Sequence, residues 1–148
     1  MKLGIASDHR GYKLKEKIKD KIKNIEIIDY GTYTEESCDY PDYAFKLGEE
    51  VASNNVDFGI AICGSGIGIS IACNKVKNIR CAKVNNKEEA YITRVDNDSN
   101  IVAFNEKTNI NDAIDIINTF INTASSTLEK HQRRIKKIKD YEDGVYVR

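Results

Sequence analysis

Short apolar segments alternate with longer segments of helical periodicity along the chain. This alternation is typical of βαβ units, in which helices join parallel strands. Each apolar segment is rich in Ile or Val and is bounded by Gly, Asp or Asn, as strands covered on both faces are. The sequence predicts five strands, at Lys2–Ala6, Glu26–Tyr30, Phe58–Ile62, Ile79–Val84 and Ile101–Phe104.

The segments between these strands predict helices. In the first, an apolar residue recurs every three or four positions from Leu14 to Ile25, and the surrounding lysines are interpreted as a solvated face. The second helix is expected to begin near Asp42, because Pro41 disfavours helix before it and an aspartate can cap the free amides. Further helices are predicted at about 66–76, 87–95 and 111–123. Short, right-handed crossovers make this an open, doubly wound α/β fold, a three-layer αβα sandwich of Rossmann-like type.

The length of 148 residues suits a single domain spanning residues 1–148, of which about 125–148 form a C-terminal helix and tail. Ser125 or Ser126 is expected to cap that helix. Its apolar residues are few and narrowly placed: Leu128, Ile135 and Ile138. Because such a helix cannot bury much against its own domain, we expect it to reach across a dimer interface.

The composition argues against several classes of protein. Lys plus Arg and Asp plus Glu both number 23, so no overall basic field attracts nucleic acid or an anionic membrane. No segment approaches the ~20 apolar residues of a membrane span, and the N-terminus lacks a signal-peptide core. The four cysteines form no C-x-x-C pair and there are two histidines, which predicts neither a metal site nor a disulfide framework. We expect a cytoplasmic protein without nucleic-acid or membrane partners.

Ligands of open α/β sheets bind beyond the carboxyl ends of the strands. Three polar segments are expected there and are predicted to converge on one cleft: SDHR at 7–10, CGSG at 63–66 and DND at 96–98. In the second, glycines at 64, 66 and 68 allow a ligand to approach the backbone, and the next helix directs free N–H groups there. This favours an anion or a developing oxyanion, although the spacing matches neither the Walker nor the dinucleotide fingerprint.

Individual residues of these segments allow two interpretations. A thiolate is favoured at a helix N-terminus and serves as nucleophile or carbon base, but by position alone Cys63 is more often a buried structural residue. Cys38, Cys73 and Cys81 are interpreted as structural. Asp8 either caps the first helix or binds a ligand.

Basic residues stand at two further places. His9 beside Arg10 at a strand end suits an anionic ligand. In the last helix Lys130 and Arg134 stand four apart on one face, with His131 and Arg133 alongside. Taken alone, this second cluster is typical of solvated surface.

Five motifs together resemble a known family. They are SDHRGYKLK near the start, DYPDYA at 39–44, CGSGIGISIACNK at 63–75, NDSNIVAF at 97–104 and KHQRRI at 130–135. Their order and spacing resemble the type B ribose-5-phosphate isomerases, over residues 1 to about 140. That family also includes the subunits of galactose-6-phosphate isomerase and the allose-6-phosphate isomerases.

The resemblance implies an enzyme of the pentose phosphate pathway that interconverts ribose 5-phosphate and ribulose 5-phosphate. Proton transfer would pass through an enediolate, with no metal and no organic cofactor. The resemblance also implies a homodimer or a dimer of dimers whose active sites are shared between subunits. Two alternatives stay open: a hexose-6-phosphate isomerase, or a subunit of one, and a sugar-phosphate-binding protein without catalysis.

The resemblance assigns roles by position. Cys63 would be the base, Asp8 would hold sugar hydroxyls, Tyr40 would wall the pocket, and Asn97 would contact the sugar from the neighbouring subunit. The loop around the enediolate oxygen would be Gly64, Ser65, Gly66, Ile67 and Gly68, with the Ser65 hydroxyl taking part in catalysis. The phosphate would be bound by His9, Lys107, Lys130 and Arg134.

The chain departs from the family pattern at three positions. Lys107 and Lys130 stand where arginines are usual, which keeps the charge but loses the two-pronged contact. Asp96 stands where the family has the histidine that opens the furanose ring. Four explanations are open: Asp96 opens the ring as a catalytic residue, His9 substitutes, the substrate is mostly open-chain, or the chain pairs with a different subunit.

Overall fold

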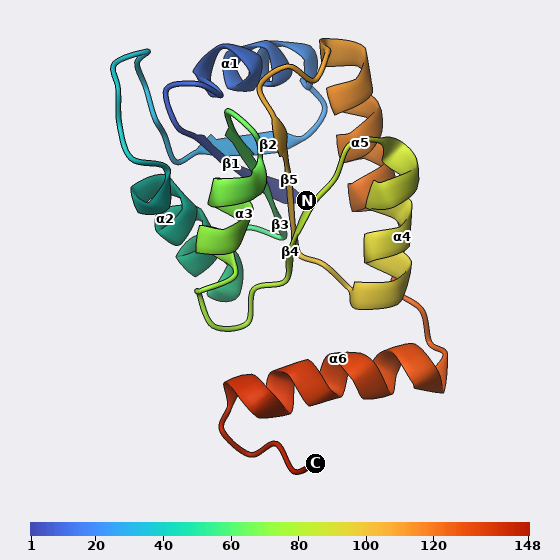
Figure 1. Cartoon of the computed structure of the whole chain (residues 1–148). Coiled ribbons are helices and arrows are strands. Elements are labelled where there is room, and N and C mark those ends of the chain that lie inside the picture. The colour runs from blue at the N-terminus through green and yellow to red at the C-terminus, as the bar shows by residue number, and fades with distance from the viewer.

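The computed structural model describes residues 1–148, which form a five-stranded, wholly parallel sheet between two layers of helices (Figure 1). The strands are β1 (Lys2–Ser7), β2 (Glu26–Asp29), β3 (Phe58–Cys63), β4 (Cys81–Lys83) and β5 (Ile101–Asn105). The helices are α1 (Tyr12–Lys21), α2 (Tyr40–Ala52), α3 (Ile67–Cys73), α4 (Lys87–Asn97), α5 (Ile110–Asn122) and α6 (Glu129–Glu142). The strand order is β2-β1-β3-β5-β4, which confirms the predicted doubly wound α/β class. No helix is both long and apolar enough to cross a bilayer.

The two faces of the sheet bury side chains of different size. One face carries large residues such as Ile5, Ile62 and Phe104, which pack against α1 and α5. The other carries small residues such as Ala61 and Ala103, which pack against α2 and α3. The strict alternation along each strand produces both faces, because successive side chains point to opposite sides.

Two paired glycines let α2 approach the sheet. Gly4 of β1 lies opposite Gly59 of β3 in the strand register. A methyl group on Gly4 would lie 2.7 Å from a Leu47 methyl, and one on Gly59 would lie 3.1 Å from Val51. Residues of α2 therefore occupy the space that side chains at Gly4 and Gly59 would take, which lets that helix pack close to β1 and β3.

The boundaries of two elements, α2 and β4, differ from the sequence predictions. α2 begins at Tyr40, so Pro41 lies in its first turn, where the amide it lacks would have no helical partner. Asp42 is therefore inside the first turn, and the expectation that it caps the helix is wrong. β4 spans only Cys81–Lys83, because this short edge strand pairs with β5 alone.

The predicted cap of the last helix is also wrong. α6 begins after Leu128, and no side chain caps it. The Ser126 hydroxyl instead accepts a hydrogen bond from the Leu128 backbone N–H at 3.1 Å, which shapes the turn before the helix. α6 lies apart from the two helix layers, beneath the sheet in the view of Figure 1, and packs against α4. Its far end reaches the loop before β4, where Glu142 accepts a hydrogen bond from the Asn78 N–H at 2.9 Å. Its buried surface is small, as expected from its few apolar residues.

One lysine of α1 contradicts the prediction of a wholly solvated face. The Lys15 side chain is fully buried, and its ammonium donates to both carboxylate oxygens of Asp29 at 2.7 and 2.6 Å. Lys19 donates to the same carboxylate at 2.6 Å. Burial alone would raise the pKa of Asp29, but the two ammonium groups outweigh it and hold the pKa below its ordinary value.

Candidate active site

Two strand ends meet at the point where the chain reverses its winding direction. β1 connects toward β2, whereas its neighbour β3 connects through α3 to the opposite edge. The crevice beyond the carboxyl ends of two such strands is the usual ligand site of doubly wound folds. The segments that follow them begin with Asp8 and Gly64, so sequence reasoning placed two of its three polar segments correctly.

Cys63 is the last residue of β3, at the carboxyl end of the sheet where such a crevice is expected. It is 3% exposed, and its sulfur accepts a hydrogen bond from the Gly66 backbone N–H at 3.2 Å. In this contact the sulfur is the hydrogen-bond acceptor. The position is thus buried, as the structural interpretation requires, and also polarised, as a reactive thiol requires.

The glycines beside Cys63 are needed for close approach. Gly66 has a φ of +75°, and a methyl group there would lie 2.8 Å from the Phe104 carbonyl carbon. A methyl group on Gly68 would lie 2.7 Å from the Tyr40 ring. Tyr40 therefore covers this loop. The Ser65 hydroxyl accepts a hydrogen bond from the Ile67 N–H at 3.1 Å and lies on the exposed side of the loop.

Asp8 faces the crevice from the end of β1. It does not cap α1, whose N-cap is Gly11. Its Oδ1 accepts hydrogen bonds from the N–H groups of Arg10 and Gly11 at 2.9 and 3.0 Å. Because both bonds go to one oxygen, the second carboxylate oxygen is available to accept a hydrogen bond from a ligand hydroxyl.

His9 is oriented by a residue that is distant in the sequence. Its Nδ1 accepts a hydrogen bond from the Cys38 backbone N–H at 3.2 Å. A ring nitrogen that accepts from an N–H carries no hydrogen, so in this arrangement the hydrogen is on Nε2. His9 therefore presents one N–H donor, which suits a phosphate oxygen.

A basic cavity of about 460 Å³ adjoins the crevice. Lys107, just after β5, lines it together with Arg10, Lys13 and Lys17. Arg10 forms an ion pair with Glu106, and its hydrogen bond lowers the pKa of that carboxyl. Glu106 also donates its backbone N–H to the Cys63 carbonyl at 3.0 Å, which ties the cavity to the end of β3.

The third polar segment lies at the other end of the sheet, which corrects the prediction of one convergent cleft. Asp96 and Asn97 are the last residues of α4, and the strand that follows runs back toward Cys63. Asn105 at the end of β5 is the residue paired with Cys63, so the segment is separated from Cys63 by the length of β5, about 13 Å at ~3.3 Å per residue step. A crossover helix runs opposite to its strands, so its C-terminal end lies at their amino ends.

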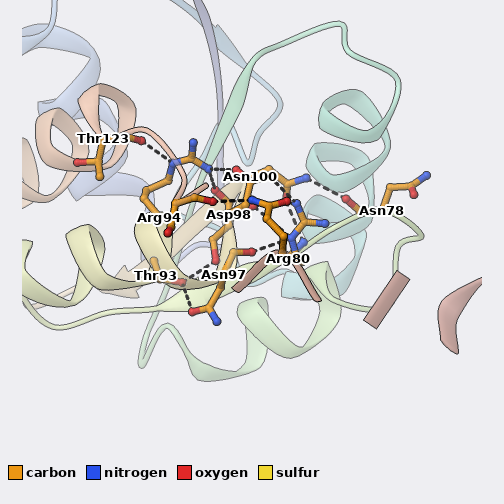
Figure 2. Close-up of polar contacts among 11 residues, drawn as sticks. Asn78, Arg80, Thr93, Arg94, Asn97, Asp98, Asn100 and Thr123 are labelled. Carbon is orange, nitrogen blue, oxygen red and sulfur yellow. Dashed lines mark hydrogen bonds and ion pairs between the residues drawn. The ribbon is translucent and has the colours of Figure 1, made fainter. Parts of the chain in front are cut away.

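Two arginines hold the end of α4 in place (Figure 2). Arg80 donates to the Asn97 carbonyl at 2.9 Å and to the Asp98 carboxylate at 3.2 Å. Arg94 donates to the other oxygen of Asp98 at 2.8 Å. Asp98 has a φ of +47°, and these bonds stabilise that left-handed turn. The Asn97 side chain is left exposed at the surface.

The remaining predicted phosphate ligands, Lys130 and Arg134, belong with Asp96 and Asn97 and not with Cys63. Lys130 and Arg134 lie on the exposed surface of α6, which packs against α4. The predicted site residues therefore divide into two sets within one chain. The first contains Asp8, His9, Tyr40, Cys63 to Gly68 and Lys107, and the second contains Asp96, Asn97, Lys130 and Arg134.

Sequence reasoning missed several contacts at these sites. Three contacts join residues that are far apart in the chain: the hydrogen bond from Cys38 to His9, the ion pair of Arg10 with Glu106, and the hydrogen bond from Arg80 to the Asn97 carbonyl. No local pattern marks such contacts, because they depend on how the strands are ordered. No group of three or more His, Cys, Asp or Glu side chains is arranged to hold a metal ion.

Comparison with known proteins gives consistent matches over nearly the whole chain. The sequence profile of the family described as Ribose/Galactose Isomerase matches residues 3–138. A putative sugar phosphate isomerase of Bacillus subtilis is 46% identical over 97% of this chain and 98% of its own length. Ribose-5-phosphate isomerase B of Escherichia coli is 41% identical over 72% of both chains.

Solved structures agree with the sequence matches. Ribose-5-phosphate isomerase B of Clostridium thermocellum superposes with a TM-score of 0.91 at 45% identity, covering 97% of this chain and 99% of that one. Ribose-5-phosphate isomerase B of Mycoplasma genitalium, solved with bound ribulose 5-phosphate, superposes with a TM-score of 0.87 at 36% identity and covers 96% of each chain.

Proposed function

The chain belongs to the ribose/galactose isomerase family, and we propose that it interconverts ribose 5-phosphate and ribulose 5-phosphate. The observation that carries this proposal is the Cys63 sulfur, buried at the switch point of the sheet and polarised by the Gly66 N–H. A site that only binds a sugar phosphate has no need of such a thiol. The two relatives solved or named as ribose-5-phosphate isomerase B support the choice of a pentose phosphate.

The geometry supports separate roles in the reaction for Cys63 and for the loop of residues 64–68. The Cys63 thiolate removes the proton from C2 of the open-chain aldose, and the electron pair forms the C1–C2 double bond of an enediolate. The proton of the C2 hydroxyl passes to the C1 oxygen, and the same sulfur returns its proton to C1, which leaves a hydroxyl at C1 and the carbonyl at C2. A carbon acid next to a carbonyl ionises only if the growing oxygen charge is stabilised, and the amides and hydroxyl of residues 64–68 serve that purpose.

The phosphate would be held by His9 and Lys107, with the exposed Lys130 and Arg134 completing its shell. Asp8 would accept hydrogen bonds from sugar hydroxyls through its free oxygen, and Tyr40 would close the pocket over Gly68. Holding both ends of the sugar fixes C1 and C2 against the sulfur, which lowers the entropic cost of reaction.

The active site would be completed by a second copy of the chain. By their proposed roles Asp96 and Asn97 would act on the same sugar as Cys63, yet within one chain they lie at the opposite end of the sheet from it. The proposed arrangement is a homodimer, or a dimer of dimers, in which α4 and α6 of one subunit face the crevice of the other. Exposed apolar side chains on α3, α4 and α6 support such an interface: Ile67, Ile71, Tyr91, Ile92 and Ile138.

The test compares the wild-type enzyme with Cys63→Ala, with Cys81→Ala as the matched control. Deuterium incorporation at C1 and C2 is followed by NMR with ribose 5-phosphate, allose 6-phosphate and galactose 6-phosphate. We expect ribose 5-phosphate to be turned over best and Cys63→Ala to lose about a hundredfold or more of the rate. Cys81 lies in β4 at the sheet edge, so its substitution should leave the rate unchanged.

Two outcomes would contradict the proposal. Binding of ribose 5-phosphate without exchange by the wild-type enzyme would indicate a sugar-phosphate-binding protein. Faster exchange with either hexose 6-phosphate would move the assignment to the hexose branch of the family.

A further inference from the structure

His131 is the only buried residue of α6. Its Nε2 lies 3.6 Å from Oδ1 of Asp96, at the end of α4. A second link joins the segment before α6 to α4, because the Ser126 N–H donates to the Val95 carbonyl at 3.0 Å. The buried imidazole and the carboxylate thus meet at a junction that the backbone also holds together.

The direction of this contact follows from its chemistry. A carboxylate only accepts hydrogen bonds, so a hydrogen bond between the two groups requires the hydrogen to be on Nε2 of His131. The contact is longer than a direct hydrogen bond, and contacts between catalytic groups commonly tighten when substrate binds. The Asp96 side chain is 44% exposed, so the carboxylate meets the buried imidazole on one side and remains open to a ligand on the other.

We propose that His131 is a positioning residue that orients Asp96 for opening the furanose ring of the substrate bound by the partner subunit. This inference rests on the function proposed above. His131 donates to one carboxylate oxygen and leaves the other to face the sugar. Neither residue is adjacent to the other in sequence, and the pair exists only because α6 folds back on the end of α4.

The ring-opening step needs one group that first accepts and then returns a proton. The Asp96 carboxylate takes the proton from the O1 hydroxyl of the cyclic sugar, and the O–H electron pair becomes the second bond of the C1 carbonyl. The C1–O4 bond breaks with its electron pair on O4, and the Asp96 carboxyl gives its proton to that oxygen. No proton is gained or lost overall, and His131 exchanges none.

The experiment exploits a chemical difference between the two substrates. Ribulose 5-phosphate cannot close a furanose ring, because the C5 oxygen that would attack its C2 carbonyl carries the phosphate. Exchange of its C1 hydrogen with solvent therefore needs Cys63 but no ring opening. Turnover of ribose 5-phosphate and deuterium incorporation at C1 of ribulose 5-phosphate in D2O are measured for wild type, His131→Leu, His131→Gln and Asp96→Asn, with Arg133→Gln on the exposed side of α6 as the control.

We expect His131→Leu to lower kcat/KM for ribose 5-phosphate about tenfold, a part of what general acid–base catalysis contributes, and to leave the rate of deuterium incorporation at C1 of ribulose 5-phosphate unchanged. His131→Gln keeps an N–H donor at similar reach and should stay within about twofold of wild type. In an Asp96→Asn background, His131→Leu should have no further effect on turnover, because His131 acts only through the Asp96 carboxylate.

Equal losses in ribose 5-phosphate turnover and in C1 exchange of ribulose 5-phosphate would overturn the inference, since they would mean that His131 merely supports α6 and its phosphate ligands. Unchanged ribose 5-phosphate turnover in His131→Leu would overturn it as well. If that variant fails to fold, His131→Asn replaces it, because asparagine is polar but too short to reach Asp96. Loss of both turnover and C1 exchange in Cys63→Ala, alongside an unchanged ratio of turnover to exchange in the His131 variants, would uphold the proposed function and reject only this inference.

Discussion

At the scale of single residues, the reactive centre depends on the absence of a side chain at Gly66, next to Cys63. Gly66 has a φ of +75° and lies against the backbone of Phe104, so two separate constraints exclude a side chain. Its N–H is the donor to the Cys63 sulfur. The sequence predicted a glycine loop next to Cys63, but it could not show that the amide of Gly66 points at the thiol.

Gly66→Ala should therefore abolish most activity and destabilise the fold, because the backbone of β5 cannot yield. The matched control is Gly144→Ala, since Gly144 has the same φ of +75° but no atom within 4 Å of an added methyl group. We expect Gly144→Ala to lower the free energy of unfolding by about 1 kcal/mol from the left-handed strain alone, and Gly66→Ala to lower it by clearly more. Urea unfolding and the isomerase assay measure both effects. Equal losses of stability in the two variants would show that contact with Phe104 does not matter.

Residues that act across the fold were harder to predict than Cys63. His9 was singled out for its charge, but its single donor depends on the Cys38 N–H, 29 positions away. Asp8 was explained equally well as a helix cap, and only the structure places the cap at Gly11. Local sequence reveals which groups are reactive, whereas their hydrogen-bond partners come from the tertiary fold.

At the scale of elements, the strands and helices follow from periodicity because each is buried against a partner. The exceptions are places where a polar residue has a tertiary role. Lys15 belongs to a lysine-rich helix and was predicted to be solvated, yet it is buried against Asp29 of β2. This ion pair fastens α1 to an edge strand, and nothing in the spacing of lysines distinguishes Lys15 from its neighbours.

The link between α1 and β2 should make stability depend on pH. Asp29 has a lowered pKa in the folded state, so its contribution is present above the ordinary aspartate range near pH 4 and is lost as pH falls through the folded-state value. Asp29→Asn leaves the buried Lys15 charge without its main partner and should cost about 3 kcal/mol at pH 7. The difference between wild type and variant should shrink in urea titrations as the pH is lowered below about 4. A difference that is constant across this range would mean that Asp29 is not the titrating group.

At the scale of the whole molecule, the class of the fold and the motifs of the family were predictable, but the placement of Asp96 and Asn97 was not. Sequence order puts the DND segment near a strand, and the error was to assign it to the carboxyl edge. Strand direction decides this point: a segment that precedes β5 lies at its amino end, far from Cys63. The same geometry divides the predicted site residues into two sets on one chain.

A shared active site predicts that two inactive variants will restore activity when their subunits mix. Cys63→Ala keeps an intact Asn97, and Asn97→Ala keeps an intact Cys63, so a mixed dimer contains one complete site and one doubly defective site. With equal amounts, half of the dimers are mixed, so activity should recover to about a quarter of the wild-type value. The measurement is ribose 5-phosphate turnover after co-refolding the two variants.

The control for this experiment mixes Cys63→Ala with Asp8→Ala. Both residues lie in the same crevice of one chain, so every site of the mixed dimer lacks one of them and activity should stay absent. Recovery in the first mixture alone is the pattern that a site built from two subunits produces. If neither mixture recovers, Asn97 does not act on the sugar held at Cys63 of the partner, and the proposal of a site shared between subunits is wrong.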